Sequence, residues 1–157
     1  MHFENTKPVP LLASANYGAG VDLDSINMKN FHAADIYITF GSVTGNAVLK
    51  FYSGATAAAK TSAMPFTYAF SSGTIGSSSA DVLGSTSSAT ASSGATMTAS
   101  SVTSAMMVIH IDAADMDVAN AEEWLTGNIS NAASSGIAHV LAVLHPRYTD
   151  NKSATAL

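Results

Sequence analysis

The feature that most constrains the fold is a stretch in which apolar side chains recur at every second position on both sides of a short turn. It covers residues 34–54, ADIYITFGSVTGNAVLKFYSG. A period of two indicates β-strands with one buried face, and Gly45-Asn46 at its centre is typical of a tight turn between paired strands. The sequence therefore predicts a β-hairpin. The side chains expected on its buried face are Ile36, Ile38, Phe40, Ala47, Leu49 and Phe51.

Further segments have strand character and are separated by turn-rich connections. Residues 112–124, DAADMDVANAEEW, break the alternation, and Asp112 stands where it could cap one or two helical turns. Short strands with a single helical segment predict an all-β fold, namely one antiparallel β-sandwich or jelly-roll-like domain with extended terminal arms. The remaining strands are expected at residues 65–70, 105–113, 123–130 and 137–145.

Residues 71–104, SSGTIGSSSADVLGSTSSATASSGATMTASSVTS, consist almost entirely of Ser, Thr, Ala and Gly. Such a run could be a disordered excursion, or it could form loops and Ser/Thr-rich strands within one domain. Neither flank has enough strands for a sandwich of its own, and apolar residues recur inside the run, which a flexible linker does not need. We therefore predict one domain over residues 1–157. The recurring apolar residues are Ile75, Val82, Leu83, Met97 and Val102.

The composition excludes several classes of partner. Charged residues make up 11% of the chain and the net charge is −5, against roughly 25% charged residues in ordinary soluble domains. The six Lys and Arg residues are scattered, so no direct binding to nucleic acid is expected. No apolar stretch approaches the roughly 20 residues of a membrane span, so no membrane association is expected either. A surface this poor in charge suits a protein in a packed assembly.

No motif for catalysis or for a cofactor is present. The chain lacks a G-x-S-x-G elbow, a phosphate-binding loop, a dinucleotide motif and any cysteine. Asp112, Asp115 and Asp117 could suggest calcium, but they do not meet the spacing of an EF-hand loop, and carboxylates at the start of a helix, stabilised by its dipole, explain the same residues. We therefore expect no enzyme, no cofactor and no metal site.

Other polar and aromatic residues leave alternatives open. His110 and His139 occupy similar positions in two predicted strands and could meet across a sheet as a polar pair. The single Trp124, together with the tyrosines, could line a glycan-binding surface. Aromatic residues of this kind also serve as core or interface anchors.

The two ends of the chain are candidates for docking. Two prolines extend the N-terminal residues 1–12, which are expected to form an arm. In the C-terminal residues 146–157, Arg147 and Tyr148 follow the last predicted strand, and these residue types are enriched at interface hot spots. A local ion pair between Arg147 and Asp150 is the alternative. The candidate partner-binding residues are Pro8, Pro10, Leu11, Leu12, Pro146, Arg147 and Tyr148.

The order of these segments resembles a group of small virion structural proteins of tailed bacteriophages. The residues that carry the resemblance are IYITFGSVTGNAVLKFYSGAT, then MMVIHIDAADMDVANAEEWLT, and a last strand that ends in HPRY. The shared pattern is a Val/Ile-rich strand, a G-x-x-T-G turn, an L-K strand, a later I-D-A-x-x-[LM]-D and a terminal P-R-Y. It covers roughly residues 33–56 and 106–149 and does not extend to the Ser/Thr-rich run.

The resemblance implies a capsid decoration, or cement, protein. Such a protein binds the outer surface of the major capsid protein lattice and stabilises the head. The expected partner is therefore the major capsid protein, the expected location is the outer capsid surface of the virion, and a homo-oligomer is expected. The alternatives are a receptor- or glycan-binding module of a head fibre or tail, and a minor protein of the head–tail joint.

Overall fold

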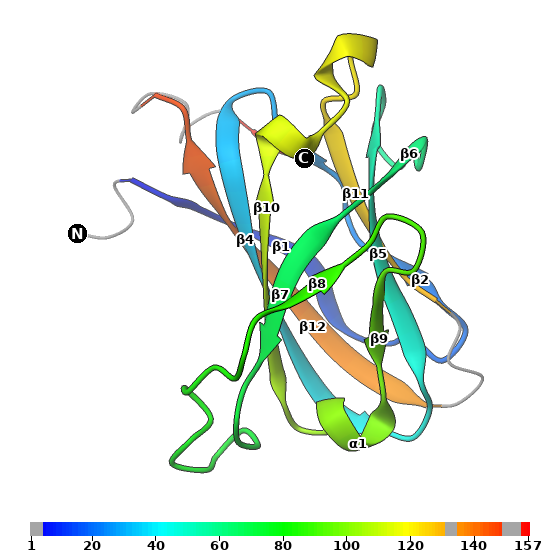
Figure 1. Ribbon diagram of the computed structural model, residues 1–157, viewed down its shortest axis with the longest axis vertical. Coiled ribbons are helices and arrows are strands. Elements are labelled where there is room, and N and C mark those ends of the chain that lie inside the picture. The colour runs from blue at the N-terminus through cyan, green and yellow to red at the C-terminus, as the bar shows by residue number, and fades with distance from the viewer. Residues whose placement is uncertain (1–4, 131–134, 149–154) are drawn as a thin grey trace.

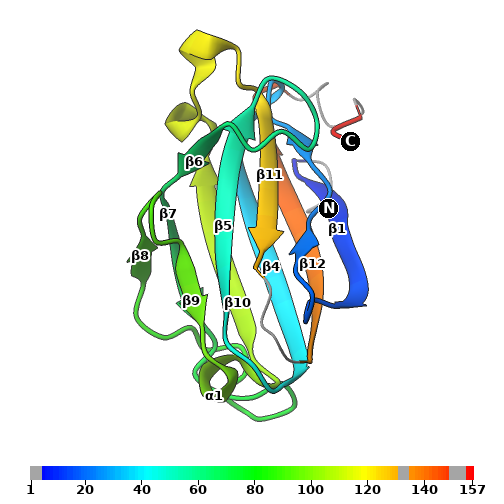
Figure 2. The same ribbon diagram turned by 90° about the vertical axis from the view of Figure 1, so that its right-hand side faces the viewer.

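The computed structural model describes residues 5–130, 135–148 and 155–157, and Figures 1 and 2 show two views of its elongated body of strands. The first sheet contains, in spatial order, β1 (Lys7–Asn16), β12 (Gly136–Pro146), β4 (Phe31–Val43), β10 (Met106–Asp112), β7 (Phe66–Phe70) and β8 (Ser87–Ala89). The second contains β2 (Val21–Asp22), β11 (Trp124–Ile129), β5 (Ala47–Gly54) and β6 (Ser62–Met64), with β3 (Ile26–Asn27) against β11 and β9 (Ala95–Met97) against β5. The short helical turns are α1 (Ala99–Val102), η2 (Ala113–Asp115) and η3 (Val118–Asn120).

Each strand pair in the two sheets is antiparallel, which confirms the predicted all-β sandwich. The pairing is nested along the chain: β1 pairs with β12, β2 with β11, β4 with β10, and β5 with β6. A long antiparallel ribbon folded over on itself gives this order, which is the jelly-roll arrangement. Strands β7 and β8 extend the first sheet beyond β10.

The predicted hairpin over residues 34–54 is wrong in its pairing, although both of its strands exist. Strand β4 lies between β12 and β10 in the first sheet, whereas β5 lies between β11 and β6 in the second. The turn at Gly45-Asn46 therefore crosses from one sheet to the other, and Gly45 is not among the glycines with a positive φ. An apolar period of two shows which side chains of a strand face the core. It does not show which strands pair, so a hairpin and a crossing between two sheets give the same pattern.

The core lies between the two sheets and contains the side chains that the alternation predicts. Ile36, Ile38 and Leu49 have no exposed surface, and Phe51 is 1% exposed. Phe51 of the second sheet meets Phe66 of the first edge to face, with ring centroids 5.2 Å apart. Burying each such side chain contributes about 1.5–3 kcal/mol, so contact between the sheets is the main source of stability.

The N-terminal segment is an edge strand where an arm was expected. Residues 7–12 belong to β1 and pair with β12, with Lys7 opposite Leu144, and Val9 and Leu11 are each 3% exposed in the core. Prolines are compatible with an edge strand, because one side of it needs no backbone N–H donors. Residues 1–4 of the expected arm lie outside the described residues.

The C-terminal tail is described only at its two ends. Residues 155–157 return to the body of the molecule, where Ala156 is 2% exposed and its carbonyl accepts a hydrogen bond of 2.8 Å from the backbone N–H of Asn27. This end of the tail therefore packs beside β3. Residues 149–154, including Asp150, lie outside the described residues, so the ion pair considered for Arg147 stays a prediction.

The Ser/Thr-rich run divides into two parts. We call residues 71–86 the apolar loop and residues 87–104 the inner segment. The inner segment supplies β8 to the first sheet and β9 to the second, and Met97 and Val102 have no exposed surface. The apolar loop connects β7 to β8 and lies at the lower end of the molecule in Figure 1.

Candidate functional site

The apolar loop presents three large apolar side chains to solvent. Ile75 is 51% exposed, Val82 52% and Leu83 44%. Solitary exposed apolar residues are normal on a protein surface, but three in one loop make this loop a candidate for contact with a partner. Asp81 is the only charged residue of this loop. The sequence identified these apolar positions, but it gave no sign that they face outward while Met97 and Val102 face inward.

Backbone hydrogen bonds hold the apolar loop in one shape. Ser72 N–H donates to the carbonyl of Val82 at 2.7 Å, and Gly84 N–H donates to the carbonyl of Phe70 at 2.8 Å. The N–H of Ile75 donates to the carbonyl of Ser104 at 2.6 Å, which ties the loop to the segment before β10. A loop of this length without strands of its own is usually a functional element or a disordered one. These hydrogen bonds favour an ordered surface.

The predicted docking residues of the two chain ends lie on two neighbouring strands of the first sheet, β1 and β12, and just after β12. Pro8 of β1 stands opposite Val143 of β12 and Pro10 opposite Leu141, whereas Pro146 stands opposite Phe31 of β4. Pro8 and Pro10 are exposed, whereas Leu11 is buried and Leu12 is partly buried against the core. The structure therefore places the prolines of the two ends on neighbouring strands but at different heights along them, and it removes Leu11 from the surface.

Arg147 and Tyr148 follow the end of β12, where Arg147 is bonded to the start of β4. The Arg147 Nε–H donates to the carbonyl of Phe31 at 3.0 Å, and its backbone N–H donates to the carbonyl of Asn30 at 2.9 Å. Tyr148 is 74% exposed. Beside Arg147 lies a hollow of about 200 Å³ with Met28 and Met116 in its wall. Arg147 is thus anchored to the sheet, while Tyr148 is available for contact.

The outer face of the first sheet carries a histidine–carboxylate cluster that the sequence did not reveal. Asp35 of β4 accepts hydrogen bonds from His110 Nδ1 at 2.7 Å and from His145 Nε2 at 2.8 Å. The ring of His32 lies 5.8 Å from that of His145. Partial burial disfavours the charged form of Asp35, but the bonds from the two histidines outweigh it and hold the pKa of Asp35 below its usual range.

His110 and His139, which could have met across a sheet, do not do so. His110 stands opposite Asp35 on β4, whereas His139 stands opposite Thr39 on the same strand. The two histidines are therefore separated along the strand direction. Their partners follow from the register of three adjacent strands, which the sequence alone does not give.

The acidic segment after β10 forms two short helical turns, as expected. Asp112 caps η2, with its Oδ1 accepting from Ala114 N–H at 2.8 Å, and Asp117 caps η3. This confirms the capping interpretation of Asp112. Within residues 5–130, 135–148 and 155–157, no group of three or more His, Asp or Glu side chains could hold a metal ion. The same residues contain no helix long and apolar enough to cross a membrane.

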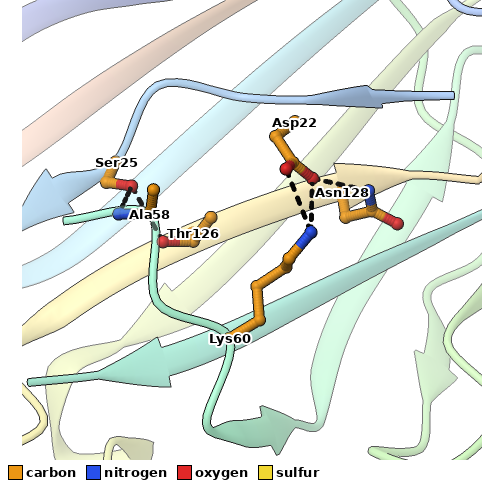
Figure 3. Close-up of polar contacts among 6 residues, drawn as sticks. All are labelled: Asp22, Ser25, Ala58, Lys60, Thr126 and Asn128. Carbon is orange, nitrogen blue, oxygen red and sulfur yellow. Dashed lines mark hydrogen bonds and ion pairs between the residues drawn. The ribbon is translucent and has the colours of Figure 1, made fainter. Parts of the chain in front are cut away.

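Strand β2 and the 55–61 connection are joined across the outer face of β11, as Figure 3 shows. The Lys60 Nζ donates to Asp22 Oδ1 at 2.9 Å and to Oδ2 at 3.0 Å, and Asn128 Nδ2 donates to Asp22 Oδ1 at 2.6 Å. The hydrogen bond from Lys60, more than that from Asn128, holds the pKa of Asp22 below its usual range. We call Asp22, Lys60 and Asn128 the clasp.

A second set of hydrogen bonds lies beside the clasp. Ser25 Oγ lies 2.8 Å from Thr126 Oγ1 and accepts from Ala58 N–H at 2.7 Å. Thr126 consequently has no exposed surface, although it lies on the outward face of β11. Together with the clasp, these contacts fix the 23–25 and 55–61 connections over the second sheet. Trp124 lies at the end of this covered strand.

Comparisons with known proteins identify no family. No protein-family model and no curated protein matches the chain. Among solved structures, the SPBc2 prophage-derived protein YomS is similar with a TM-score of 0.48 at 11% identity, over 89% of this chain and 92% of that one. The infectious bursal virus-derived T=1 particle protein has a TM-score of 0.25 at 10% identity, over 97% of this chain and 42% of that one. These similarities are too low to transfer any function.

Proposed function

We propose that this chain is a capsid decoration protein of a tailed bacteriophage, which binds the outer surface of the major capsid protein lattice and stabilises the head. The order of sequence motifs in residues 33–56 and 106–149 supports the class of protein. A double-sheet jelly roll is compatible with it, since this architecture recurs in viral capsid and lectin domains. That agreement is an analogy at the level of the fold.

The observation that carries the proposal is the apolar loop. Its three exposed apolar side chains stand on a hydrogen-bonded scaffold, so little conformational entropy is lost when the loop docks. One charge in the whole loop means that burial against a neutral apolar surface leaves few ions to desolvate. A closed protein shell offers such a surface in many identical copies, which suits a homo-oligomer that binds by apolar contact.

The second contact in this proposal combines the Pro146–Tyr148 segment with the exposed Pro8 and Pro10 of the neighbouring strand β1. An anchored arginine beside an exposed tyrosine is typical of interface hot spots. Strand β1 is also the outer strand of the first sheet, and an outer strand can pair with a strand of a partner. The proposal gives the chain no catalytic role, no cofactor and no contact with nucleic acid.

The first experiment asks whether the chain lies on the capsid exterior, by cryo-electron microscopy of the virion with a count of copies per particle. We expect density for the chain on the outer shell in numbers that follow the capsid lattice. A few copies at the neck would favour the head–tail joint instead. Absence from the particle exterior would overturn the proposal.

The second experiment measures co-sedimentation of purified variants with capsids that lack the chain. Ile75→Ser combined with Val82→Ser and Leu83→Ser should weaken binding at least about tenfold, a change of about 1.4 kcal/mol, and leave the thermal midpoint nearly unchanged. Ile137→Ser removes a similarly exposed side chain, 43% exposed, from β12 and serves as the control. The double variant Arg147→Ala, Tyr148→Ala tests the second contact. Undiminished binding of the triple variant would exclude the apolar loop as the docking surface.

A further inference from the structure

A hollow opens on the outer face of the second sheet, at the end of the covered part of β11. Its volume is about 440 Å³, within the range of roughly 300–1,000 Å³ found for small-molecule sites. Leu125 and Ile129 of β11 face the core, so the alternation of the strand turns Trp124 outward into this hollow. The residues that line it include Asp22, Asp24, Ser25, Ala58, Trp124 and Leu157.

We infer that this hollow is a binding site for a neutral sugar. Trp124 is partly buried, so part of its ring is held by the sheet and part is open to the hollow. Its indole N–H has no hydrogen-bond partner among the residues that the structure describes. An aromatic ring offers an apolar face to the C–H groups of a pyranose, and the free N–H donates to a hydroxyl.

Asp24 supplies the complementary acceptor. It is exposed and lines the same hollow, and its carboxylate has no partner among the described residues. A carboxylate that accepts two hydrogen bonds fits a pair of neighbouring sugar hydroxyls. Hydrogen bonds to a charged group are the stronger kind, so Asp24 is the residue expected to fix the orientation of the sugar.

The rim of the hollow is fixed before any ligand arrives. The clasp and the contacts of Ser25 with Thr126 and Ala58 hold both connections over β11. Ala58 itself has a positive φ of 63°, an unfavourable conformation for a residue other than glycine that persists only where the surroundings impose it. A preorganised rim reduces the entropy cost of binding.

The charges select against acidic ligands. Asp22 and Asp24 both line the hollow, while the ammonium group of Lys60 is engaged by Asp22 at 2.9 Å. The side of the hollow that holds Asp24 is therefore net negative, and a carboxylate or phosphate on the ligand would be repelled there. Neutral hexoses and N-acetylhexosamines are the class that fits.

The test uses the purified chain and does not depend on capsid docking. Trp124 is the only tryptophan of the chain, so its fluorescence reports on this hollow alone. Glucose, galactose, mannose, N-acetylglucosamine and the disaccharides lactose and cellobiose are titrated, with glucuronic acid as the acidic counterpart, and amide NMR follows the same titrations. We expect at least one neutral sugar to change the emission of Trp124 and to shift amides of residues 22–25 and 57–60.

Asp24→Ala should weaken that binding at least about tenfold without lowering the thermal midpoint, because the carboxylate holds no other part of the fold. Asp81→Ala removes an equal charge from the apolar loop and should bind as the parent does. The inference is overturned if no sugar changes either signal. It is also overturned if Asp24→Ala binds normally, or if glucuronic acid binds as well as glucose.

Discussion

The two parts of the Ser/Thr-rich run have nearly the same composition and opposite positions in the fold. The inner segment buries Ala89, Ala95 and Met97 at 2% exposure or less, whereas the apolar loop leaves Ile75 and Val82 about half exposed. What separates them is strand pairing. Strands β8 and β9 are paired with β7 and β5. The backbone hydrogen bonds of the apolar loop lie mainly within the loop, to Phe70 at the end of β7 and to residues 104–106 around the start of β10.

This difference shows that small neutral residues do not by themselves define a linker. Ser and Thr are compatible with a strand where neighbouring residues provide the side chains that face the core. In the inner segment these residues are Ala89, Ala95 and Met97. The apolar loop has apolar residues too, but no strand that would turn them inward. Its side chains are therefore available to a partner.

The largest expected effect comes from truncating one buried and one exposed side chain of the run. Met97→Ala removes a fully buried side chain and should lower the free energy of unfolding by about 2–5 kcal/mol. Ile75→Ala should change it by no more than about 0.5 kcal/mol, as surface substitutions do. Urea unfolding of both variants measures the difference. An equal loss in Ile75→Ala would place the loop in the core and break the comparison.

A pair of glycines with positive φ sharpens the same comparison. Gly94, at φ 68°, turns the chain before β9, and a Cβ there would lie 2.5 Å from the carbonyl oxygen of Leu49. Gly76, at φ 94° in the apolar loop, has nothing within 4 Å of such an atom. The left-handed backbone should lower the free energy of unfolding of both alanine variants by about 1–2 kcal/mol. Gly94→Ala should lower it further, because the strand must also move. Similar thermal midpoints for the two variants would contradict this.

Much of the fold follows from the local pattern, and strand pairing does not. The alternation predicts the inward faces of β4, β5 and β10 because the burial of one strand face is a local property of the sequence. The crossing at Gly45-Asn46 was not predicted, because each strand there finds its neighbours in distant parts of the chain. Topology of this kind depends on contacts that no short window contains.

The candidate surfaces, too, follow from the sequence where they depend on a local pattern and not where they depend on strand pairing. Exposed prolines on an edge strand and an exposed Tyr148 agree with what the residue types suggest, but Leu11 turns inward because it alternates in phase with Val9. The sequence predicts the strands of Asp35, His110 and His145 but does not predict that these side chains form a cluster. Its members become neighbours only through the order β10, β4, β12 in the sheet.

The smallest expected effect is a change in stability at low pH. It tests whether the Ser/Thr-rich run contributes to the pH dependence of stability. Asp81 is exposed and is the only carboxylate of the run, whereas Asp35 accepts from two histidines on neighbouring strands. Since the folded-state pKa of Asp35 lies below its ordinary value of 3.8, this group contributes stability above that pH and loses it as the pH falls through the folded-state value. The free energy of unfolding of Asp35→Asn should therefore be lower than that of the parent at about pH 6. The difference between the two free energies should be smaller at about pH 3.

Asp81→Asn provides the matched control, because the same change in the apolar loop removes no described partner. Its urea midpoint should follow that of the parent at every pH, and the difference between Met97→Ala and Ile75→Ala should likewise stay constant. A difference in urea midpoint between Asp81→Asn and the parent that changes with pH would mean that the apolar loop forms a charge contact in solution. In that case the two parts of the run would differ in electrostatics as well as in packing, and neutral apolar docking would no longer follow from the composition of the loop.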